Sequence, residues 1–341
     1  MGKKVFQYEQ EFAKKFKTKY AIMTNSGSTA NLLAIAALVY SGRLKRGSEI
    51  LVPSVSWSTT YAPLEQFGMK LIFLDINKDT LNIDIESVKK AVSKDTKAIF
   101  AVNLLGNSND FNELLNICKD NNLILLEDNC ESLGATYNNK YLGTIGLMGT
   151  YSTFYSHHMC TMEGGMVVTE DQVLYEYMLA IRAHGWTRNL PKDSIIYEKK
   201  NDPFYESFNF IVPGFNLRPL EMEGAIGSVQ LNKIDRMISY RRANADYFKR
   251  KMNKFQDIRI QKEVGKSSWF GFSLVLQGKL SNKRQDLVNT LRKEKIECRP
   301  IVAGNFTRNP VIKYMNYSIP FPLTNADDIH EHGFFIGNHS S

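Results

Sequence analysis

The chain has 341 residues, of which 43% are apolar and 23% charged, a composition typical of a globular protein with room for two domains. It contains no run of about 18 apolar residues, and its N-terminus lacks the apolar core of a signal peptide, so we expect a cytoplasmic protein without a membrane span. The net charge of +8 is spread in small basic groups among acidic residues, which favours anionic small molecules over nucleic acid as ligands.

Short strand-like runs alternate with helical patterns through the first two-thirds of the chain. Most of the strand-like runs are continuously apolar, as expected for strands that are covered on both faces. The alternation predicts an α/β fold with a mainly parallel, seven-stranded sheet and helices on both sides. The predicted strands are 20–24, 49–53, 71–74, 98–103, 123–127, 150–154 and 166–169, and the predicted helices are 28–40, 85–92, 111–120 and 174–184.

The last third of the chain has a different pattern. Residues 189–209 are polar and indicate an irregular connection, which a long helical segment from 220 to about 254 follows. A strand at 270–276 and a helix at 285–294 indicate a small α/β unit. We therefore predict a large domain over residues 1–235 and a small C-terminal domain over residues 236–341.

The four cysteines, Cys118, Cys130, Cys160 and Cys298, lie far apart in the sequence and form no CxxC pair. Free thiols in a reducing compartment are the simplest interpretation. Because an iron–sulfur cluster needs four clustered thiolates, we expect no metal site.

The run Asn-Ser-Gly-Ser-Thr-Ala-Asn at residues 25–31 follows one predicted strand and opens a helix. Glycine lets the backbone approach an anion, and the first amides of a helix point at it with a favourable dipole. We expect Gly27 and Ser28 to hold a phosphate group.

Acidic residues end the fifth predicted strand, in the run Leu-Leu-Glu-Asp-Asn-Cys-Glu at residues 125–131. The carboxyl ends of strands are where open α/β sheets bind ligands. Asp128 and Glu131, followed by Gly134-Ala135, are therefore candidate binding residues, although a lone Glu-Asp pair would more often be a loop or cap.

The segment from Gly149 to Thr169 contains Ser152-Thr-Phe-Tyr-Ser-His157-His158 and ends in Glu163-Gly-Gly followed by apolar residues. It resembles the Ser-Phe-x-x-x-Lys…Glu-Gly-Gly stretch of the DegT/DnrJ/EryC1/StrS sugar aminotransferases, which use pyridoxal phosphate (PLP). In that family a lysine five residues after the serine forms the Schiff base with the cofactor. Here His157 takes its place, and imidazole forms no stable imine but can transfer protons.

The resemblance extends over nearly the whole chain and implies the aspartate-aminotransferase-like fold, PLP fold type I. It implies that Asp128 pairs with the protonated pyridine nitrogen and that Glu131 stands where a glutamine usually bonds the ring hydroxyl. Trp57, in Pro53-Ser-Val-Ser-Trp57, is similar to the aromatic residue that stacks on the cofactor. Ser152 is similar to the serine that completes the phosphate site. Neighbouring side chains on an extended chain point in opposite directions, so we expect His158 to be structural.

Further blocks similar to the family imply the substrate site and a homodimer. Asn216 would reach the cofactor phosphate of the neighbouring subunit, so that two chains share each active site. Relative to the family, the chain begins inside an N-terminal arm that helps to form the nucleotide site, and ends before a last helix. The resemblance places the nucleotide diphosphate sugar against Gly2, Lys3, His184, Arg188, Arg218 and Glu297.

The histidine occurs in one branch of the family, the 3-dehydratases of nucleotide-linked 4-keto-6-deoxy sugars. The resemblance therefore implies a dehydratase that uses the amine form of the cofactor, pyridoxamine phosphate (PMP). His157 would remove a proton from C4′ and protonate the departing C3 hydroxyl, and glutamate would restore PMP. We expect GDP-4-keto-6-deoxymannose as the substrate, on the route to the O-antigen sugar colitose.

Three alternatives stay open at this point. A CDP-sugar dehydratase shares the histidine but works with an iron–sulfur cluster, which the dispersed cysteines disfavour. A sugar aminotransferase needs a lysine, and none occurs between Tyr141 and Leu190. A non-catalytic protein, shortened at both ends, that binds a nucleotide sugar or a partner would be distinguished by failure to retain the cofactor.

Overall fold

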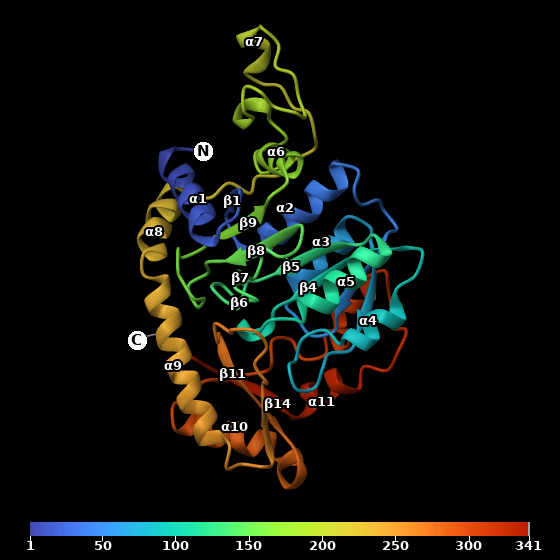
Figure 1. Cartoon of the computed structure of the whole chain (residues 1–341), viewed down its shortest axis with the longest axis vertical. Helices are drawn as coiled ribbons and strands as arrows, with labels where there is room; N and C mark the ends of the chain where they lie inside the picture. The colour runs from blue at the N-terminus through green and yellow to red at the C-terminus, as the bar shows by residue number, and fades with distance from the viewer. Residues whose placement is uncertain (340–341) are drawn as a thin grey trace.

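The computed structural model describes residues 1–339, and its centre is an eight-stranded sheet with the order β1-β9-β8-β5-β4-β2-β3-β13 (Figure 1). Only β9 runs antiparallel to its neighbours, β1 and β8. The strands are β1 (Tyr20–Thr24), β2 (Glu49–Pro53), β3 (Lys70–Leu74), β4 (Thr96–Val102), β5 (Ile124–Asp128), β8 (Met148–Ser152), β9 (Gly165–Thr169) and β13 (Tyr317–Ser318). All seven predicted strands are present within two residues of their expected ends, and the α/β fold class is confirmed.

Helices cover both faces of this sheet, because alternate residues of each strand point to opposite sides. In β4, Ala98 and Phe100 join one apolar core, and Ile99 and Ala101 join another. The continuous apolar runs in the sequence are explained by this double burial. The helices between the strands are α2 (Gly27–Tyr40), α3 (Ser58–Gln66), α4 (Ile85–Ala91), α5 (Phe111–Asn121) and α6 (Gln172–Ile181).

The predicted long helix from residue 220 is two helices, α8 (Glu221–Leu231) and α9 (Ile234–Met252). The break at residues 232–233 lets Leu231 and Ile234 both enter the core that lies under α1 (Lys3–Phe16), a helix that the sequence analysis did not predict. Gly227 permits the close approach of α1 and α8, since a Cβ there would lie 2.7 Å from the Tyr8 ring.

The C-terminal part forms a second, antiparallel sheet of order β10-β11-β14-β12, below the first in Figure 1. The predicted strand and helix are present as β11 and α10. The division at residue 235 remains a prediction, and β13 returns from this part to pair with β3 of the large sheet. The elements are β10 (Ile258–Ile260), β11 (Gly271–Leu276), α10 (Arg284–Lys293), β12 (Cys298–Arg299), α11 (Thr324–His332) and β14 (Gly333–Gly337).

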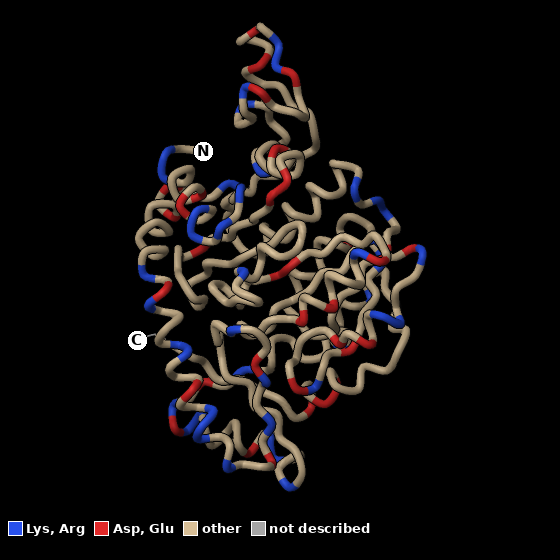
Figure 2. The backbone as a smooth tube through the Cα atoms, viewed as in Figure 1, with Lys and Arg blue, Asp and Glu red and all other residues tan. Residues whose placement is uncertain are grey.

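Smaller elements fill the connections. The irregular connection predicted at 189–209 projects from the body as an arm that carries only the short α7 (Figure 1). Basic and acidic residues are scattered among each other over the backbone, as the sequence predicts (Figure 2). Within residues 1–339, no helix has the length and apolar character needed to span a bilayer. The remaining elements are β6 (Thr136–Tyr137), β7 (Lys140–Tyr141), α7 (Pro203–Glu206) and the 3₁₀ turns Leu104–Gly106, Thr187–Asn189, Gly278–Lys283, Phe306–Arg308 and Pro310–Tyr314.

Candidate active site

Four predicted site residues lie at or just beyond the carboxyl ends of strands in the large sheet. Gly27 follows β1, Trp57 follows β2, Asp128 ends β5 and Ser152 ends β8. Parallel strands end at one edge of a sheet, and this edge is the usual ligand site of open α/β folds. The topology therefore brings together residues that are more than a hundred positions apart in the sequence.

The start of α2 forms a cradle suited to a phosphate group. Ser26 caps the helix by accepting a hydrogen bond from the Thr29 amide at 3.1 Å. A Cβ at Gly27 would lie 2.6 Å from the Cβ of Ser152, so only glycine lets the helix start pack against β8. The Ser28 hydroxyl donates to Thr59 at 3.1 Å. The predicted phosphate residues Gly27, Ser28 and Ser152 thus lie around one helix N-terminus.

Asp128 is 5% exposed, and neutral donors hold both of its oxygens. Its Oδ2 accepts hydrogen bonds from Asn31 Nδ2 at 2.9 Å and from the Thr60 hydroxyl at 2.8 Å. Its Oδ1 accepts from the Cys130 amide at 3.1 Å. These three hydrogen bonds fix the orientation of the carboxyl group at the end of β5.

Glu131 lies beside this carboxylate and is held by a backbone donor. Its Oε2 accepts from the Leu105 amide at 2.8 Å, in the 3₁₀ turn that follows β4. Burial, and then the nearby negative charge of Asp128, raise the pKa of Glu131 to about 7. A partly protonated carboxyl can donate as well as accept, as a glutamine side chain does.

His157 lies in the turn after β8, where its amide donates to the Phe154 carbonyl at 2.9 Å. Its ring packs on Phe270 with a centroid distance of 5.2 Å. Nδ1 is buried without a hydrogen-bond partner among the described residues. Burial, and secondarily the positive charge of Arg241, lower the pKa of His157 to about 4. The imidazole is therefore neutral at pH 7 and able to accept a proton.

His158 is 2% exposed, and its Nε2 donates to the Ser268 carbonyl at 3.2 Å. Burial holds its pKa well below the usual value. The sequence argument that the two rings point in opposite directions is wrong, because residues 155–157 turn and both rings pack on Phe270. The buried hydrogen bond nevertheless favours a structural role for His158.

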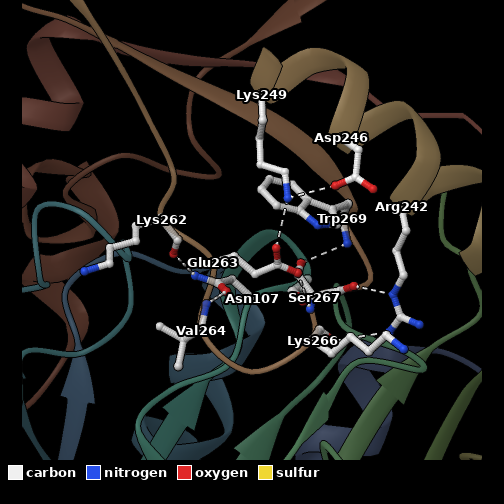
Figure 3. A network of polar contacts seen from close by, with 11 residues as sticks. Asn107, Arg242, Asp246, Lys249, Lys262, Glu263, Val264, Lys266, Ser267 and Trp269 are labelled. Carbon is white, nitrogen blue, oxygen red and sulfur yellow. Dashed lines mark hydrogen bonds and ion pairs between the residues drawn. The ribbon is translucent and has the colours of Figure 1, made fainter. Parts of the chain in front are cut away.

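The segment that supports both histidines is itself fixed by the polar network of Figure 3. Lys249 of α9 pairs with Glu263 at 3.1 Å, and the Glu263 carboxylate accepts from the Ser267 amide at 3.0 Å. Arg242 donates to the Ser267 carbonyl at 2.8 Å. The network joins α9 to the segment just before Phe270, so the small sheet and the histidine turn share one rigid support.

His157 should contribute a loss of stability to the cofactor-free protein as the pH falls from 7 to 5. Folding lowers the pKa of His157 from 6.5 to about 4. Between these two pH values the imidazole is mostly protonated in the unfolded chain and mostly neutral in the folded chain. This group alone should lower the free energy of unfolding by about 1–2 kcal/mol at pH 5.

Urea unfolding of the unaltered protein and of His157→Asn at both pH values measures this contribution as the difference between their pH dependences, because His158, Glu131 and the other titrating groups are common to both proteins. An equal pH dependence in both proteins would contradict the expectation.

Trp57 is 60% exposed and immediately precedes α3. Such exposure of a large apolar ring at the ligand edge of the sheet is consistent with a role in binding. That its ring stacks on a cofactor remains a prediction.

The predicted substrate residues His184, Arg188 and Arg218 and the predicted cofactor residue Asn216 have exposed side chains. Leu217 accepts from the Asn25 amide at 3.1 Å, which joins this segment to the start of α2. Arg218 donates to Asn216 at 2.9 Å, and Arg188 lies over the Trp186 ring at 5.1 Å. His184 adopts a left-handed backbone conformation with φ 65°.

The other three predicted substrate residues lie farther out in one chain. The Gly2 amide donates a hydrogen bond to Glu221 at 2.8 Å, and Glu221 follows Arg218 by three residues in the sequence. Lys3 begins α1. Glu297 pairs with Arg299 at the edge of the small sheet. No hydrogen bond or ion pair within residues 1–339 joins Gly2, Lys3 or Glu297 to His157 or Asp128.

Sequence reasoning missed the residues that hold the Asp128 carboxylate. Asn31 and Thr60 were not identified, and neither was Thr150, whose hydroxyl donates to Asn31 at 2.6 Å. One signal was available for Asn31, because it is the only polar residue in the apolar helix stretch from Ala30 to Val39.

The arrangement fits a phosphorylated pyridine cofactor. The cradle at Gly27 would receive the phosphate, Asp128 would face the ring nitrogen, and the unpartnered Nδ1 of His157 would be available to the reacting atoms. All four cysteines are free thiols, and among residues 1–339 no three His, Cys, Asp or Glu side chains gather as a metal site.

Comparison with known proteins agrees with this geometry. The DegT/DnrJ/EryC1/StrS aminotransferase family pattern matches residues 1–341. GDP-4-keto-6-deoxy-D-mannose 3-dehydratase of Escherichia coli O55:H7 is 56% identical, over 99% of this chain and 88% of that protein. The enzyme of the same name from Yersinia pseudotuberculosis is 54% identical, over 99% of this chain and 87% of that protein.

A crystal structure of GDP-4-keto-6-deoxymannose-3-dehydratase with a trapped PLP–glutamate geminal diamine superimposes with a TM-score of 0.98. The two proteins are 55% identical, and the match covers 100% of this chain and 89% of the other. The chain belongs to the DegT/DnrJ/EryC1/StrS aminotransferase family.

Proposed function

We propose that this protein is a PMP-dependent 3-dehydratase that removes the C3 hydroxyl of a GDP-linked 4-keto-6-deoxy sugar, with 4-keto-6-deoxymannose as the sugar. The main support for this proposal is His157, a neutral imidazole at the position of the family's lysine, whose Nδ1 has no hydrogen-bond partner among the described residues. The similarity to two 3-dehydratases over nearly the whole chain supports the same reaction.

The protein's own residues divide the work. PMP, when bound, supplies an amine for the keto group and a ring that accepts electrons. Asp128 would hold the ring nitrogen protonated, Gly27, Ser28 and Ser152 would bind the phosphate, Glu131 would bond the ring hydroxyl, and Trp57 would cover one face. His157 would take a proton at C4′ and deliver it to the departing hydroxyl.

The low pKa of His157 affects the two proton transfers in opposite ways. Burial lowers this pKa to about 4, so the neutral ring is a weaker base than an ordinary imidazole. The ring is therefore fully in its base form before the reaction. Once protonated, it is a stronger acid than an ordinary imidazolium, which helps the hydroxyl to leave as water.

The net reaction requires an amino donor and balances in atoms and electrons. The sugar loses one oxygen atom as water and gains two electrons at C3. Glutamate supplies those electrons when it reacts with one water molecule to give 2-oxoglutarate and ammonia. The solved structure with a PLP–glutamate adduct supports glutamate as this donor.

We also propose a homodimer with shared active sites. His184, Arg188, Asn216 and Arg218 have exposed side chains in one chain, as residues that reach a neighbour's site would. Gly2, Lys3 and Glu297 would complete the sugar diphosphate site in this assembly. Residues 1–235 would form the cofactor-binding domain and residues 236–341 the small domain.

The test is incubation with GDP-4-keto-6-deoxymannose, PLP and glutamate, followed by mass spectrometry. The proposal expects a sugar nucleotide lighter by one oxygen atom, together with 2-oxoglutarate and ammonia. A 4-amino sugar that keeps all its hydroxyls would identify an aminotransferase instead. Turnover of only the CDP-linked sugar, with stoichiometric iron in the protein, would identify the cluster-dependent dehydratase.

PLP should bind to this protein without a covalent bond, because His157 replaces the lysine. Borohydride reduction of the PLP-loaded protein should leave its mass unchanged after denaturation. His157→Lys is the matched control, since it should gain the mass of a pyridoxyl group. A pyridoxyl adduct on a peptide from residues 145–170 of the unaltered chain would contradict the expectation.

A further inference from the structure

The Asp128 carboxylate is held by a buried network that the proposed reaction does not yet use. Asn31 and Thr60 donate to the same oxygen, Oδ2, at 2.9 and 2.8 Å. Asn31 is 1% exposed and Thr60 is fully buried. Both donors come from helices that begin at the ligand edge of the sheet, α2 and α3. They lie 97 and 68 positions before Asp128 in the sequence.

The orientation of Asn31 is fixed by its other contacts. Its Oδ1 accepts from the Thr150 hydroxyl at 2.6 Å, so the Nδ2 group must face Asp128. Nδ2 also donates to the Thr59 carbonyl at 3.1 Å. A flipped amide would place an acceptor oxygen against the carboxylate and lose these bonds. The side chain of Thr60 is similarly constrained by Ser56, 2.8 Å away.

Two donors on one oxygen have two consequences for the other oxygen. Hydrogen bonds from neutral donors replace the water that burial removes from the carboxylate. Oδ1 accepts a hydrogen bond from the Cys130 amide at 3.1 Å, and Asn31 and Thr60 do not contact it. The network therefore fixes the orientation of the carboxylate and leaves Oδ1 as the oxygen that a ligand can approach.

We propose that Asn31 and Thr60 are positioning residues that set the protonation of the cofactor ring through Asp128. The inference rests on the proposed function. An ionised, correctly turned Asp128 keeps the pyridine nitrogen protonated, and this protonation makes the ring an electron acceptor. Loss of either donor leaves a carboxylate that is free to rotate, so its oxygen would no longer be held toward the ring nitrogen and would favour the ring proton less.

The test uses Asn31→Ala and Thr60→Val, with Thr96→Val as the matched control. Thr96 is equally buried but lies at the opposite end of its strand, where it accepts from the Ser93 amide. PLP affinity is measured by equilibrium dialysis, and ring protonation by the nitrogen NMR shift of ¹⁵N-labelled PLP bound to the protein. Each site variant should bind PLP about ten- to a hundred-fold more weakly and move the shift toward neutral pyridine. The control should change neither value.

Thr60→Ser keeps the hydroxyl and should restore the shift, which a loss of packing alone would not predict. Unchanged shifts in Asn31→Ala and Thr60→Val that remain folded by circular dichroism would overturn the inference, as would a loss of thermal stability with no change in shift. Asp128→Asn distinguishes a failure of this inference from a failure of the proposed cofactor site. If it alters the shift while the other two variants do not, only this inference fails. If it also leaves the shift and the affinity unchanged, the proposed cofactor site fails.

Discussion

Replacing His157 by asparagine should lower the dehydration rate about a hundred- to ten-thousand-fold, the usual effect of losing one general acid–base group. Asparagine has similar size and polarity but accepts no proton at neutral pH. Its side chain fits the space beside Phe270, so the variant should still bind PMP and the keto sugar. The measurement is single-turnover loss of the C3 oxygen by mass spectrometry, with PMP affinity measured in parallel.

His158→Asn is the matched control for this prediction. His158 is buried and bonded to the Ser268 carbonyl, so its replacement should reduce stability but slow turnover far less than the first variant. His157→Lys should suppress dehydration as well, because its amine captures PLP. If His158→Asn abolishes turnover while His157→Asn remains active, the wrong histidine has been assigned.

Removing Glu9 should be the most damaging single change to stability. Glu9 and Arg182 form a buried ion pair that joins α1 to the end of α6, and Arg182 is 1% exposed. Both residues also bond to Met23 of β1. Glu9 accepts a hydrogen bond from the Met23 amide at 2.8 Å, and Arg182 donates one to the Met23 carbonyl at 2.7 Å. Glu9→Ala would leave a buried guanidinium without its counter-ion, which typically costs about 3–5 kcal/mol.

Urea unfolding of the variants measures this cost. Asp235→Ala breaks the Lys15–Asp235 pair, in which the Asp235 side chain is 75% exposed, and should cost less than about 1 kcal/mol. Replacing both buried partners, in Glu9→Leu with Arg182→Met, should recover much of the loss because no charge is left unpaired. A cost below about 1 kcal/mol for Glu9→Ala alone would show that the guanidinium finds other partners or water.

Local sequence patterns determined the large sheet and the positions of the chemical groups. The apolar runs specified the seven strands, since a strand buried on both faces needs apolar residues throughout. The spacing from Ser152 identified His157, and the strand-end position identified Asp128. The strands and the position of Asp128 depend on residues close together in the sequence, so periodicity was enough to find them, whereas the choice of His157 came from the resemblance to the family.

Contacts between distant segments were decided only in the folded chain. The break between α8 and α9, the packing of α1 and the return of β13 to β3 follow from burial against residues far away in the sequence. The bond from Asn31 to Asp128 spans 97 positions. The low pKa of His157 arises from burial and the charge of Arg241, neither of which a local pattern can express. The sequence by itself named the acid–base and charged groups, whereas the tertiary structure set their protonation and orientation, because both depend on desolvation and on partners that only folding brings near.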